Sequence, residues 1–334
     1  MKAIQFVKNS SAAGSAREVE LEKPVATGRD LLVRVEAVGL NPVDYKVRPA
    51  EGEAPKVLGF DAAGVVAAVG AECELFQVGD PVFYAGDVTR PGSNTEFQLV
   101  DERIVGRRPA SLDAAASAAL PLTALTAWEA LFDRLGIDLE GGDAGKSLLI
   151  IGGAGGVGSM AIQLAKLAGL RVIATASREE SAAWCRDLGA DEVINHHGDM
   201  PEQLRELGSD FVDFIANFND IESAWEAMGE MIAPQGSLVL ITDHQAHLDL
   251  AGPMKRKSVS IHWEFMFTRA MFGTADMIAQ HEILTRVAEL IDAGKLTATA
   301  NDSLSPITAE NILEGHRRME AKSAIGKLTI TGWA

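Results

Sequence analysis

The feature that most constrains this chain is a glycine-rich segment between an apolar run and an amphipathic helix pattern. Residues 148–168 read LLIIGGAGGVGSMAIQLAKLA, with Gly153, Gly155 and Gly158 in G-x-G-x-x-G spacing. A buried strand followed by a tight turn and a helix N-terminus can bind a pyrophosphate. Glycines let the pyrophosphate approach the backbone N–H groups, and the helix dipole favours its negative charge. We expect a dinucleotide here, and the alternative is a turn that binds nothing. The expected contacts are Gly153, Gly155, Gly156 and Val157.

Charge and cysteine content narrow the class of function. The 334 residues include 30 basic and 47 acidic ones, a formal net charge of −17. Such a surface repels nucleic acid and anionic membranes, so an anionic cofactor needs a local positive charge. Cys73 and Cys185 lie far apart and are expected to be reduced packing residues. With no targeting segment and no run of 18 apolar residues in sight, we expect a cytoplasmic protein.

The first third of the chain has the pattern of a β-rich region. Its apolar alternation and turn residues predict strands at 3–7, 17–22, 31–39, 63–70, 81–84 and 95–100. The opening MKAIQFV is expected to form an edge strand. The alanine- and leucine-rich stretch 112–135 predicts two helices that break at Pro121.

Strands and helices then alternate from 146 to about 263. The expected strands are 148–151, 171–175, 193–195, 211–216, 237–241 and 258–263, and the expected helices are 157–168, 179–188, 200–207 and 220–231. This alternation predicts an α/β fold with a doubly wound parallel (Rossmann) sheet. A long helix at 275–292, a helix at 308–319 and a strand at 326–330 follow. We expect a dinucleotide-binding domain over 124–266, inserted in a second domain of residues 1–123 and 267–334, with the reaction centre in a cleft between them.

The residues after the second strand of this sheet indicate which dinucleotide binds. An acidic residue there selects NAD by binding the ribose hydroxyls. This chain has Ala176, Ser177 and Arg178 instead, and an Arg–phosphate contact is charge-assisted. We expect Ser177 and Arg178 to bind the 2′-phosphate of NADPH. The alternative is a solvated arginine beside two glutamates.

Several segments together resemble the zinc-free, quinone oxidoreductase-like branch of the medium-chain dehydrogenase/reductase family. They are GLNPVDYKVR (39–48), VLGFDAAGVVAAVG (57–70), VGDPVF (78–83), LPLTALTAWEAL (120–131), the glycine turn, and WEFMFTRAMF (263–272) through IGKLTI (325–330). The C-terminal part resembles a subgroup often labelled zinc-type alcohol dehydrogenase-like. The resemblance implies a GroES-like catalytic domain beside the Rossmann domain, and NADPH-dependent reduction of quinones or α,β-unsaturated carbonyl compounds.

The same resemblance permits a test of the zinc label. Zinc-dependent relatives have a cysteine at the position of Asn41, a histidine at that of Phe60, and a cysteine or histidine at that of Leu122. Phenylalanine and leucine cannot bind zinc, and an asparagine amide is a poor ligand. The hydroxyl that relays protons in zinc enzymes falls at Val43 here. We therefore expect no metal.

Without a metal, hydrogen-bond donors must polarise the substrate carbonyl. Asn41 resembles the family asparagine that faces nicotinamide and substrate, although an Asn-Pro turn residue explains it equally well. Tyr45 and Lys46 are further candidates for donor or proton source. Family members often have the tyrosine at the position of Lys46, which leaves its role open.

The remaining cofactor candidates come from the resemblance and from strand ends. By resemblance, Thr126 and Lys327 lie near the nicotinamide. Asn217 and Thr242 follow the fourth and fifth strands, at the carboxyl ends where cofactors bind. Among Trp263, Phe265 and Phe267, one or two are expected to line an apolar substrate site.

Two other functions stay open: a metal-independent carbonyl reductase or alcohol dehydrogenase, and a non-catalytic NADPH-binding protein. The family commonly dimerises through edge strands of its nucleotide domains, and 258–263 is the expected edge here. We expect a homodimer acting on a small carbonyl or quinone substrate that the sequence does not name.

Overall fold

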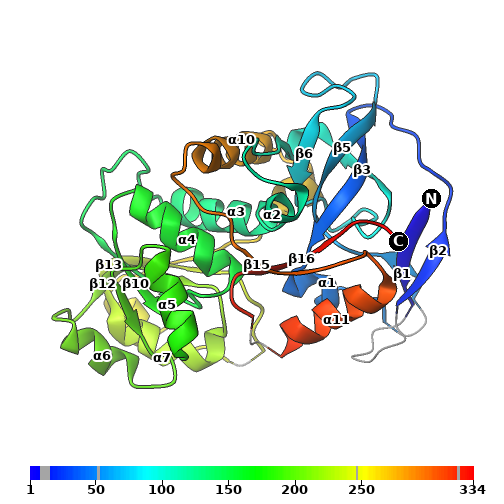
Figure 1. The fold of residues 1–334 in the computed structure, drawn as a ribbon. Coiled ribbons are helices and arrows are strands. Elements are labelled where there is room, and N and C mark those ends of the chain that lie inside the picture. Colours follow the sequence, from blue (N-terminus) through cyan, green and yellow to red (C-terminus); the bar gives the residue numbers. More distant parts are fainter. Residues whose placement is uncertain (8–15, 51–52, 246, 322–323) are drawn as a thin grey trace. The chain divides into compact units, whose positions relative to one another are not determined.

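The computed structural model describes residues 1–7, 16–50, 53–245, 247–321 and 324–334. Two compact units make up the chain (Figure 1). We call Met1–Leu125 together with Phe267–Ala334 the split unit, and Thr126–Met266 the inserted unit. Within the described ranges, no helix has the length and apolar character needed to cross a membrane.

A six-stranded parallel sheet forms the centre of the inserted unit. Its strands are β9 (Ser147–Ile151), β10 (Arg171–Thr175), β11 (Glu192–Ile194), β12 (Val212–Asn217), β13 (Ile232–Leu240) and β14 (Ser260–Trp263). Their order is β11-β10-β9-β12-β13-β14, and each neighbouring pair is parallel. The predicted doubly wound sheet is therefore confirmed. The strand order reverses beside β9, so the carboxyl end of β9 is where such a sheet binds ligands.

The helices of this unit follow the strands they connect. They are α4 (Gly156–Leu167), α5 (Glu179–Asp187), α6 (Met200–Glu206), α7 (Ile221–Met231) and the short α8 (Pro253–Arg256), which the sequence did not predict. Apolar side chains of the sheet and of α7 form one buried cluster, including Leu149, Ile215, Leu238, Trp225 and Met228. Strand β13 begins five residues before the predicted one, because the chain pairs with β12 from Ile232 onward across a register shift.

The split unit contains two sheets. The larger one has the order β15 (Ala300–Leu304), β16 (Lys327–Thr331), β3 (Asp30–Gly39), β5 (Asp61–Val69), β6 (Pro81–Tyr84), β8 (Val105–Arg107), with β7 (Phe97–Asp101) paired to β3. The smaller has the order β2 (Ala16–Glu20), β1 (Lys2–Phe6), β4 (Lys56–Val57). The expectation that 1–7 form an edge strand is wrong, because the two-residue β4 pairs with the other side of β1.

Short helices connect these sheets. They are α1 (Pro42–Lys46), the 3₁₀ turn η1 (Glu102–Ile104), α2 (Ala114–Ala118), α3 (Pro121–Trp128), α9 (Thr268–Phe272), α10 (Ala279–Asp292) and α11 (Ala309–Glu320). The predicted helix break is confirmed, since α2 ends before Pro121 and this proline opens α3, where its missing N–H costs nothing. A π-helical segment, η2 (Glu129–Arg134), continues α3 into the inserted unit.

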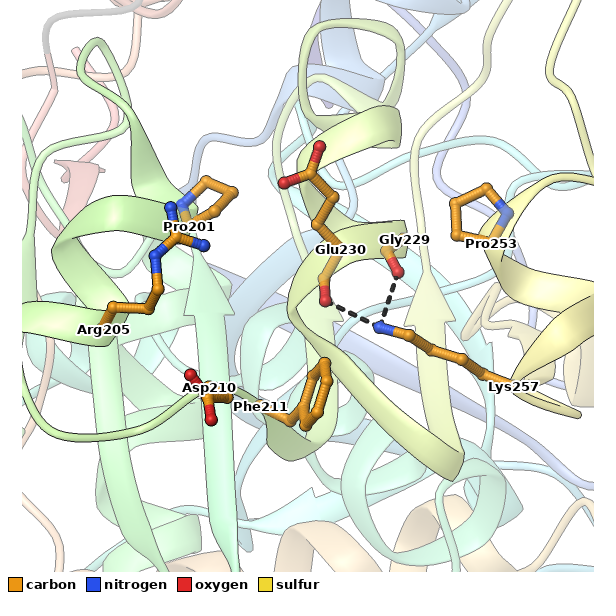
Figure 2. Close-up of a pocket in the computed structure, with 8 residues that line it drawn as sticks. All are labelled: Pro201, Arg205, Asp210, Phe211, Gly229, Glu230, Pro253 and Lys257. Atoms are coloured by element: carbon orange, nitrogen blue, oxygen red, sulfur yellow. Dashed lines mark hydrogen bonds between the residues drawn. The ribbon is translucent and has the colours of Figure 1, made fainter.

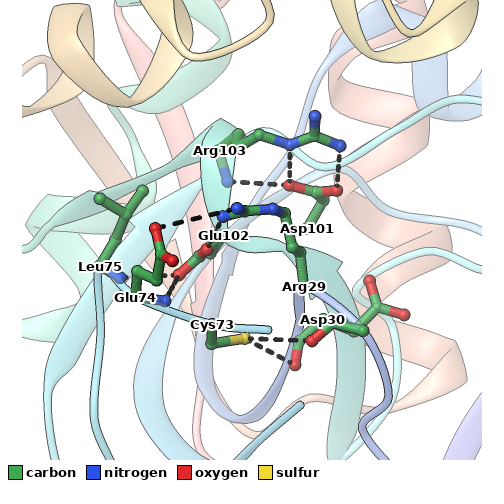
Figure 3. Close-up of polar contacts among 9 residues, drawn as sticks. Arg29, Asp30, Cys73, Glu74, Leu75, Asp101, Glu102 and Arg103 are labelled. Atoms are coloured by element: carbon green, nitrogen blue, oxygen red, sulfur yellow. Dashed lines mark hydrogen bonds and ion pairs between the residues drawn. The ribbon is translucent and has the colours of Figure 1, made fainter. Parts of the chain in front are cut away.

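A buried carboxylate at the start of η1 holds the chain segment that contains Glu74 and Leu75 (Figure 3). Glu102 is fully buried and accepts hydrogen bonds from the backbone N–H groups of Glu74 and Leu75 and from Arg29 at 2.7–2.9 Å. The thiol of Cys73 donates to the carbonyl of Asp30 at 3.4 Å. Both cysteines of the chain are free thiols.

Candidate functional site

The glycine turn joins β9 to α4 at the carboxyl end of the inserted unit's sheet. The hydroxyl and carbonyl oxygens of Thr175, the last residue of β10, accept hydrogen bonds from the N–H groups of Gly152 and Gly153 at 3.1 and 3.2 Å. Gly156 and Val157 open α4, whose first N–H groups have no partner inside the helix. This is the geometry of an anion site at a helix N-terminus.

The three glycines of the motif have different surroundings. A Cβ on Gly158 would lie 2.2 Å from the carbonyl oxygen of Gly152, and one on Gly153 would lie 2.8 Å from Cβ of Ala174. These two glycines permit close packing within the protein. A Cβ on Gly155 would meet only the Gly152 carbonyl, at 3.5 Å. Gly155 therefore leaves its side of the turn open for a ligand to approach the backbone.

Ser177 and Arg178 lie between β10 and α5, at the same edge of the sheet. Ser177 is half-buried, whereas Arg178 is exposed and occupies the cap position of α5. The N–H of Arg178 donates to the Ser181 hydroxyl at 3.2 Å, which fixes the start of this helix. The three residues between the end of β10 at Thr175 and the start of α5 include no Asp or Glu.

Asn217 is the last residue of β12 and Thr242 lies two residues after the end of β13, at the same edge of the sheet, and both hydrogen-bond to Asn219. The side-chain oxygen of Asn217 accepts from the N–H of Asn219 at 2.9 Å, and the Thr242 hydroxyl donates to its carbonyl at 2.7 Å. Asn219 in turn lies against Gly152. The two predicted contacts thus shape the wall of the glycine turn, and Asn219 is a residue that the sequence did not single out.

Thr126, a predicted cofactor contact, is buried in α3.

Two residues that sequence reasoning missed, Ser159 and Trp184, support the glycine turn. The Ser159 hydroxyl donates to the Gly155 carbonyl at 2.7 Å and accepts from the indole N–H of Trp184 at 2.9 Å. This links the first turn of α4 to α5. No sequence motif predicts this hydrogen bond, because a serine in a helix and a tryptophan 25 residues later are common in any α/β domain.

In the split unit, Lys327 lies at the centre of a buried polar group. Its ammonium donates to the carbonyl of Leu40 at 2.8 Å, to Oδ1 of Asn41 at 2.6 Å and to Oδ2 of Asp61 at 2.9 Å. Nδ2 of Asn41 donates to the same Asp61 oxygen at 2.8 Å. We call Leu40, Asn41, Asp61 and Lys327 the Lys327 cluster.

The cluster contains two of the predicted site residues, Asn41 and Lys327. Asn41 is 1% exposed, and its amide hydrogen-bonds to Asp61 and Lys327. That Asn41 also faces nicotinamide and substrate stays a prediction. The Lys327 ammonium donates its three hydrogens to oxygens of the cluster. That it lies near the nicotinamide stays a prediction. The second oxygen of Asp61 accepts from the backbone N–H of Leu122 at 2.7 Å, so Leu122 supplies its backbone to the cluster.

Asp44, on α1, adjoins this cluster. Its Oδ2 accepts from the N–H of Asn41 at 2.6 Å, while Oδ1 is buried without a hydrogen-bond partner among the described residues. Burial raises the pKa of Asp44 to about 7, and the nearby Asp61 acts in the same direction. Lys327 and the Asn41 N–H oppose this shift. With a pKa of about 7, the protonated and ionised forms of the Asp44 carboxyl are both populated near neutral pH.

Tyr45 and Lys46 follow on α1 but face different surroundings. Tyr45 is half-buried and meets the ring of His316 edge-on, 6.4 Å between centroids, whereas Lys46 is exposed. Burial, and secondarily Glu320, raises the pKa of Tyr45, so its hydroxyl keeps its proton.

The neighbour of Tyr45, His316, contacts a buried arginine. Arg48 lies 2.6 Å from Nδ1 of His316 and 3.1 Å from Glu320. Burial lowers the pKa of His316 to about 3, so this ring is neutral.

The three aromatic residues proposed near the substrate differ in exposure. Phe267 is 2% exposed and packs edge-on against Phe60, with ring centroids 5.2 Å apart. Trp263 and Phe265 are 52% and 47% exposed. Phe267 is thus a core residue of the split unit, and the other two have surface available for contact.

One cavity of about 370 Å³ lies elsewhere on the inserted unit (Figure 2). It is near the amino ends of β12 and β13, at the edge opposite the glycine turn, and its lining is Pro201, Arg205, Asp210, Phe211, Gly229, Glu230, Pro253 and Lys257. The Lys257 ammonium donates to the carbonyls of Gly229, Glu230 and Ile232 at 2.7–3.0 Å. These hydrogen bonds tie Lys257 to the carboxyl end of α7 and to the start of β13.

Comparison with known proteins gives matches along most of the chain. A family model for the alcohol dehydrogenase GroES-like domain matches residues 27–109, and one for zinc-binding dehydrogenases matches 156–280. A zinc-type alcohol dehydrogenase-like protein of Staphylococcus epidermidis is 41% identical over 99% of both chains.

Solved structures match as well. A candidate zinc-dependent alcohol dehydrogenase from Rhizobium etli CFN 42 has a TM-score of 0.95 and 47% identity, covering 100% of this chain and 98% of that one. The quinone oxidoreductase from Coxiella burnetii has a TM-score of 0.81 and 26% identity, covering 100% and 99%.

The name of the second matched model implies zinc, and the donor set here does not fit it. The described residues include no group of three His, Cys, Asp or Glu side chains able to hold a metal ion. Zinc relatives have their ligands at the positions of Phe60, Leu122 and Asn41. In this chain the Phe60 ring packs on Phe267, Leu122 has an apolar side chain, and the Asn41 amide is bound to an ammonium. A second cation beside Lys327 would be repelled.

Proposed function

The chain belongs to the medium-chain dehydrogenase/reductase family, in its zinc-free, quinone oxidoreductase-like branch, and we propose that it reduces quinones or α,β-unsaturated carbonyl compounds with NADPH. That it is an oxidoreductase with a nicotinamide cofactor follows from the family. The preference for NADPH and the class of substrate are the proposal. The Coxiella burnetii neighbour, a quinone oxidoreductase, supports the substrate class.

The observation that carries the cofactor choice is the end of β10. Ser177 and Arg178 stand where an acidic residue would bind the ribose hydroxyls of NAD. In a chain of net charge −17, an exposed guanidinium at this edge supplies the local positive charge that a 2′-phosphate needs. We assign the pyrophosphate to the N–H groups of the turn at Gly155, Gly156 and Val157.

When bound, NADPH supplies a hydride, and the protein must position the acceptor and stabilise charge on its oxygen. Conjugated substrates and quinones need little further activation, because the added charge spreads onto oxygen. Among the candidates, we assign hydrogen-bond donation to Tyr45, whose raised pKa keeps the hydroxyl protonated. Lys46 is the second candidate, and Asn41 acts through the Lys327 cluster rather than as a free donor.

Turnover with NADPH and with NADH over a panel of quinones, enones, enoyl thioesters and saturated ketones tests the proposal. We expect NADPH to be preferred and quinones or enones to be reduced fastest. Activity confined to saturated ketones would instead make the protein a metal-independent carbonyl reductase. Tight NADPH binding with no accelerated oxidation by any member of the panel would make it a non-catalytic binding protein.

We further propose a cytoplasmic homodimer. Both cysteines are free thiols, as is usual in a reducing compartment. Strand β14 ends the parallel sheet, and pairing with a second β14 would satisfy its open backbone groups. Sedimentation should show a species of twice the chain's mass, and a monomer at all concentrations would contradict the dimer.

A further inference from the structure

Three oxygen atoms enclose the ammonium of Lys327. They are the carbonyl oxygen of Leu40, Oδ1 of Asn41 and Oδ2 of Asp61, at 2.8, 2.6 and 2.9 Å. The Lys327 side chain is 4% exposed and that of Asp61 is 0% exposed. Because an ammonium carries three hydrogens, each oxygen receives one of them. The three oxygens thus form a small cation site, and the cation in it is the ammonium at the end of the Lys327 side chain.

The charge balance of the site depends on this ammonium. Asp61 is a buried carboxylate, and the paired Lys327 compensates its charge. Removing one partner of a buried pair leaves the other charge uncompensated, which is strongly unfavourable. The second oxygen of Asp61 is held by the N–H of Leu122, so the carboxylate cannot simply turn away.

The ammonium also decides the orientation of the Asn41 amide. Oδ1 of Asn41 faces Lys327, and Nδ2 faces Asp61 at 2.8 Å. Flipping the amide would place its NH₂ against the ammonium and its oxygen against the carboxylate. Lys327 therefore fixes Asn41, and with it the start of α1, the helix that carries Tyr45.

We infer that Lys327 is the resident cation of this site, a positioning residue for Asn41 and α1, and that removing its side chain leaves a binding site for a small primary ammonium ion. The inference deepens the proposed function and depends on it only for the activity readout. The positive charge that a metal ion would bring to these oxygens is already supplied by the ammonium.

The test is chemical rescue of Lys327→Ala. This variant lacks three methylene groups and the ammonium, which n-propylammonium replaces. We expect the variant to melt at a lower temperature than the wild type and to transfer hydride roughly 100-fold more slowly, the scale of a misplaced active-site element. Adding n-propylammonium should restore both properties saturably. Tetramethylammonium at equal ionic strength, which has no N–H donor, should restore neither.

Lys295→Ala is the matched control, an exposed lysine of the same unit, and it should melt and react as the wild type does with or without amine. Wild-type melting and activity in Lys327→Ala would overturn the inference, as would equal rescue by both cations. Rescue of melting without rescue of hydride transfer would reduce Lys327 to a purely structural residue and contradict its positioning role.

If the wild type reduced no member of the substrate panel, the proposed function would fail, while amine-dependent melting of Lys327→Ala would still decide the cation site. If Lys327→Ala did not fold even with amine, the double variant Asp61→Asn, Lys327→Met would replace it, since it removes both buried charges. We expect that variant to fold and to remain slow. Wild-type activity in it would overturn the inference.

Discussion

The glycine turn and the Lys327 cluster are built on opposite principles. The turn uses backbone groups of one contiguous segment, and its side chains matter mainly by their absence at Gly153, Gly155 and Gly158. The Lys327 cluster uses side chains from the residue that caps α1, from β5 and from β16, with Lys327 separated from Asn41 by 286 positions in the sequence. The comparison teaches that a site made of backbone can be located from one local motif. A site made of distant side chains is different: Asn41 and Lys327 were predicted separately, by resemblance, and only the fold shows that they are paired.

The comparison predicts that buried charge controls stability around the Lys327 cluster. Asp44→Asn, beside this cluster, tests this prediction and has the largest expected effect on the free energy of unfolding. The pKa of Asp44 is raised from 3.8 to about 7, so its contribution to stability is fully present below pH 4 and is lost as the pH rises through 7. Asparagine does not ionise. The free energy of unfolding of the variant should therefore rise relative to the wild type between pH 4 and 8, by about 4 kcal/mol for a shift of this size.

Asp292→Asn is the contrasting control, measured by the same denaturant titrations. The hydroxyl of Ser111 and the N–H groups of Ala110 and Ser111 lower the pKa of Asp292, so its contribution is lost as the pH falls. The two variants should thus change the pH dependence with opposite signs. A pH-independent difference between Asp44→Asn and the wild type would show that Asp44 is not the titrating group.

The sequence predicted the inserted unit well, for a physical reason. Its buried parallel strands are continuous apolar runs, and each helix begins close to where its amphipathic pattern begins, as at Gly156 and Glu179. The short elements of the split unit, such as β4 and α1, carry too few residues to show a period. That Lys327 lies near the nicotinamide stays a prediction. Its hydrogen bonds to Leu40, Asn41 and Asp61 could not be predicted, because an ammonium donates to whichever oxygens the fold places around it.

A pair of glycine variants separates packing from ligand approach at the turn. Gly158→Ala places a Cβ 2.2 Å from a backbone oxygen and should lower the free energy of unfolding by about 3 kcal/mol. Gly155→Ala has open space and should leave stability nearly unchanged, while weakening NADPH binding by roughly tenfold or more. Chemical denaturation and fluorescence titration measure the two effects. Equal stability loss in both variants would contradict the assignment.

Arg178→Ala tests the one charged side chain assigned to the turn's ligand, with a smaller expected effect. Loss of a charge-assisted contact to the 2′-phosphate of about 2 kcal/mol raises KM for NADPH roughly 30-fold and leaves KM for NADH unchanged. Arg186→Ala is the matched control, because Arg186 is an exposed arginine of the same helix. Equal changes for both cofactors would remove Arg178 from the proposed site.

The central claim is hydride transfer by a site whose cation is a lysine rather than a metal. The most direct measurement is quinone or enone reduction with NADPH before and after exhaustive dialysis against a chelator, and again after zinc is added back. The account predicts activity that stays within about twofold throughout, because no step passes through a metal-bound water or carbonyl. Activity that vanishes on dialysis and returns with zinc would contradict it.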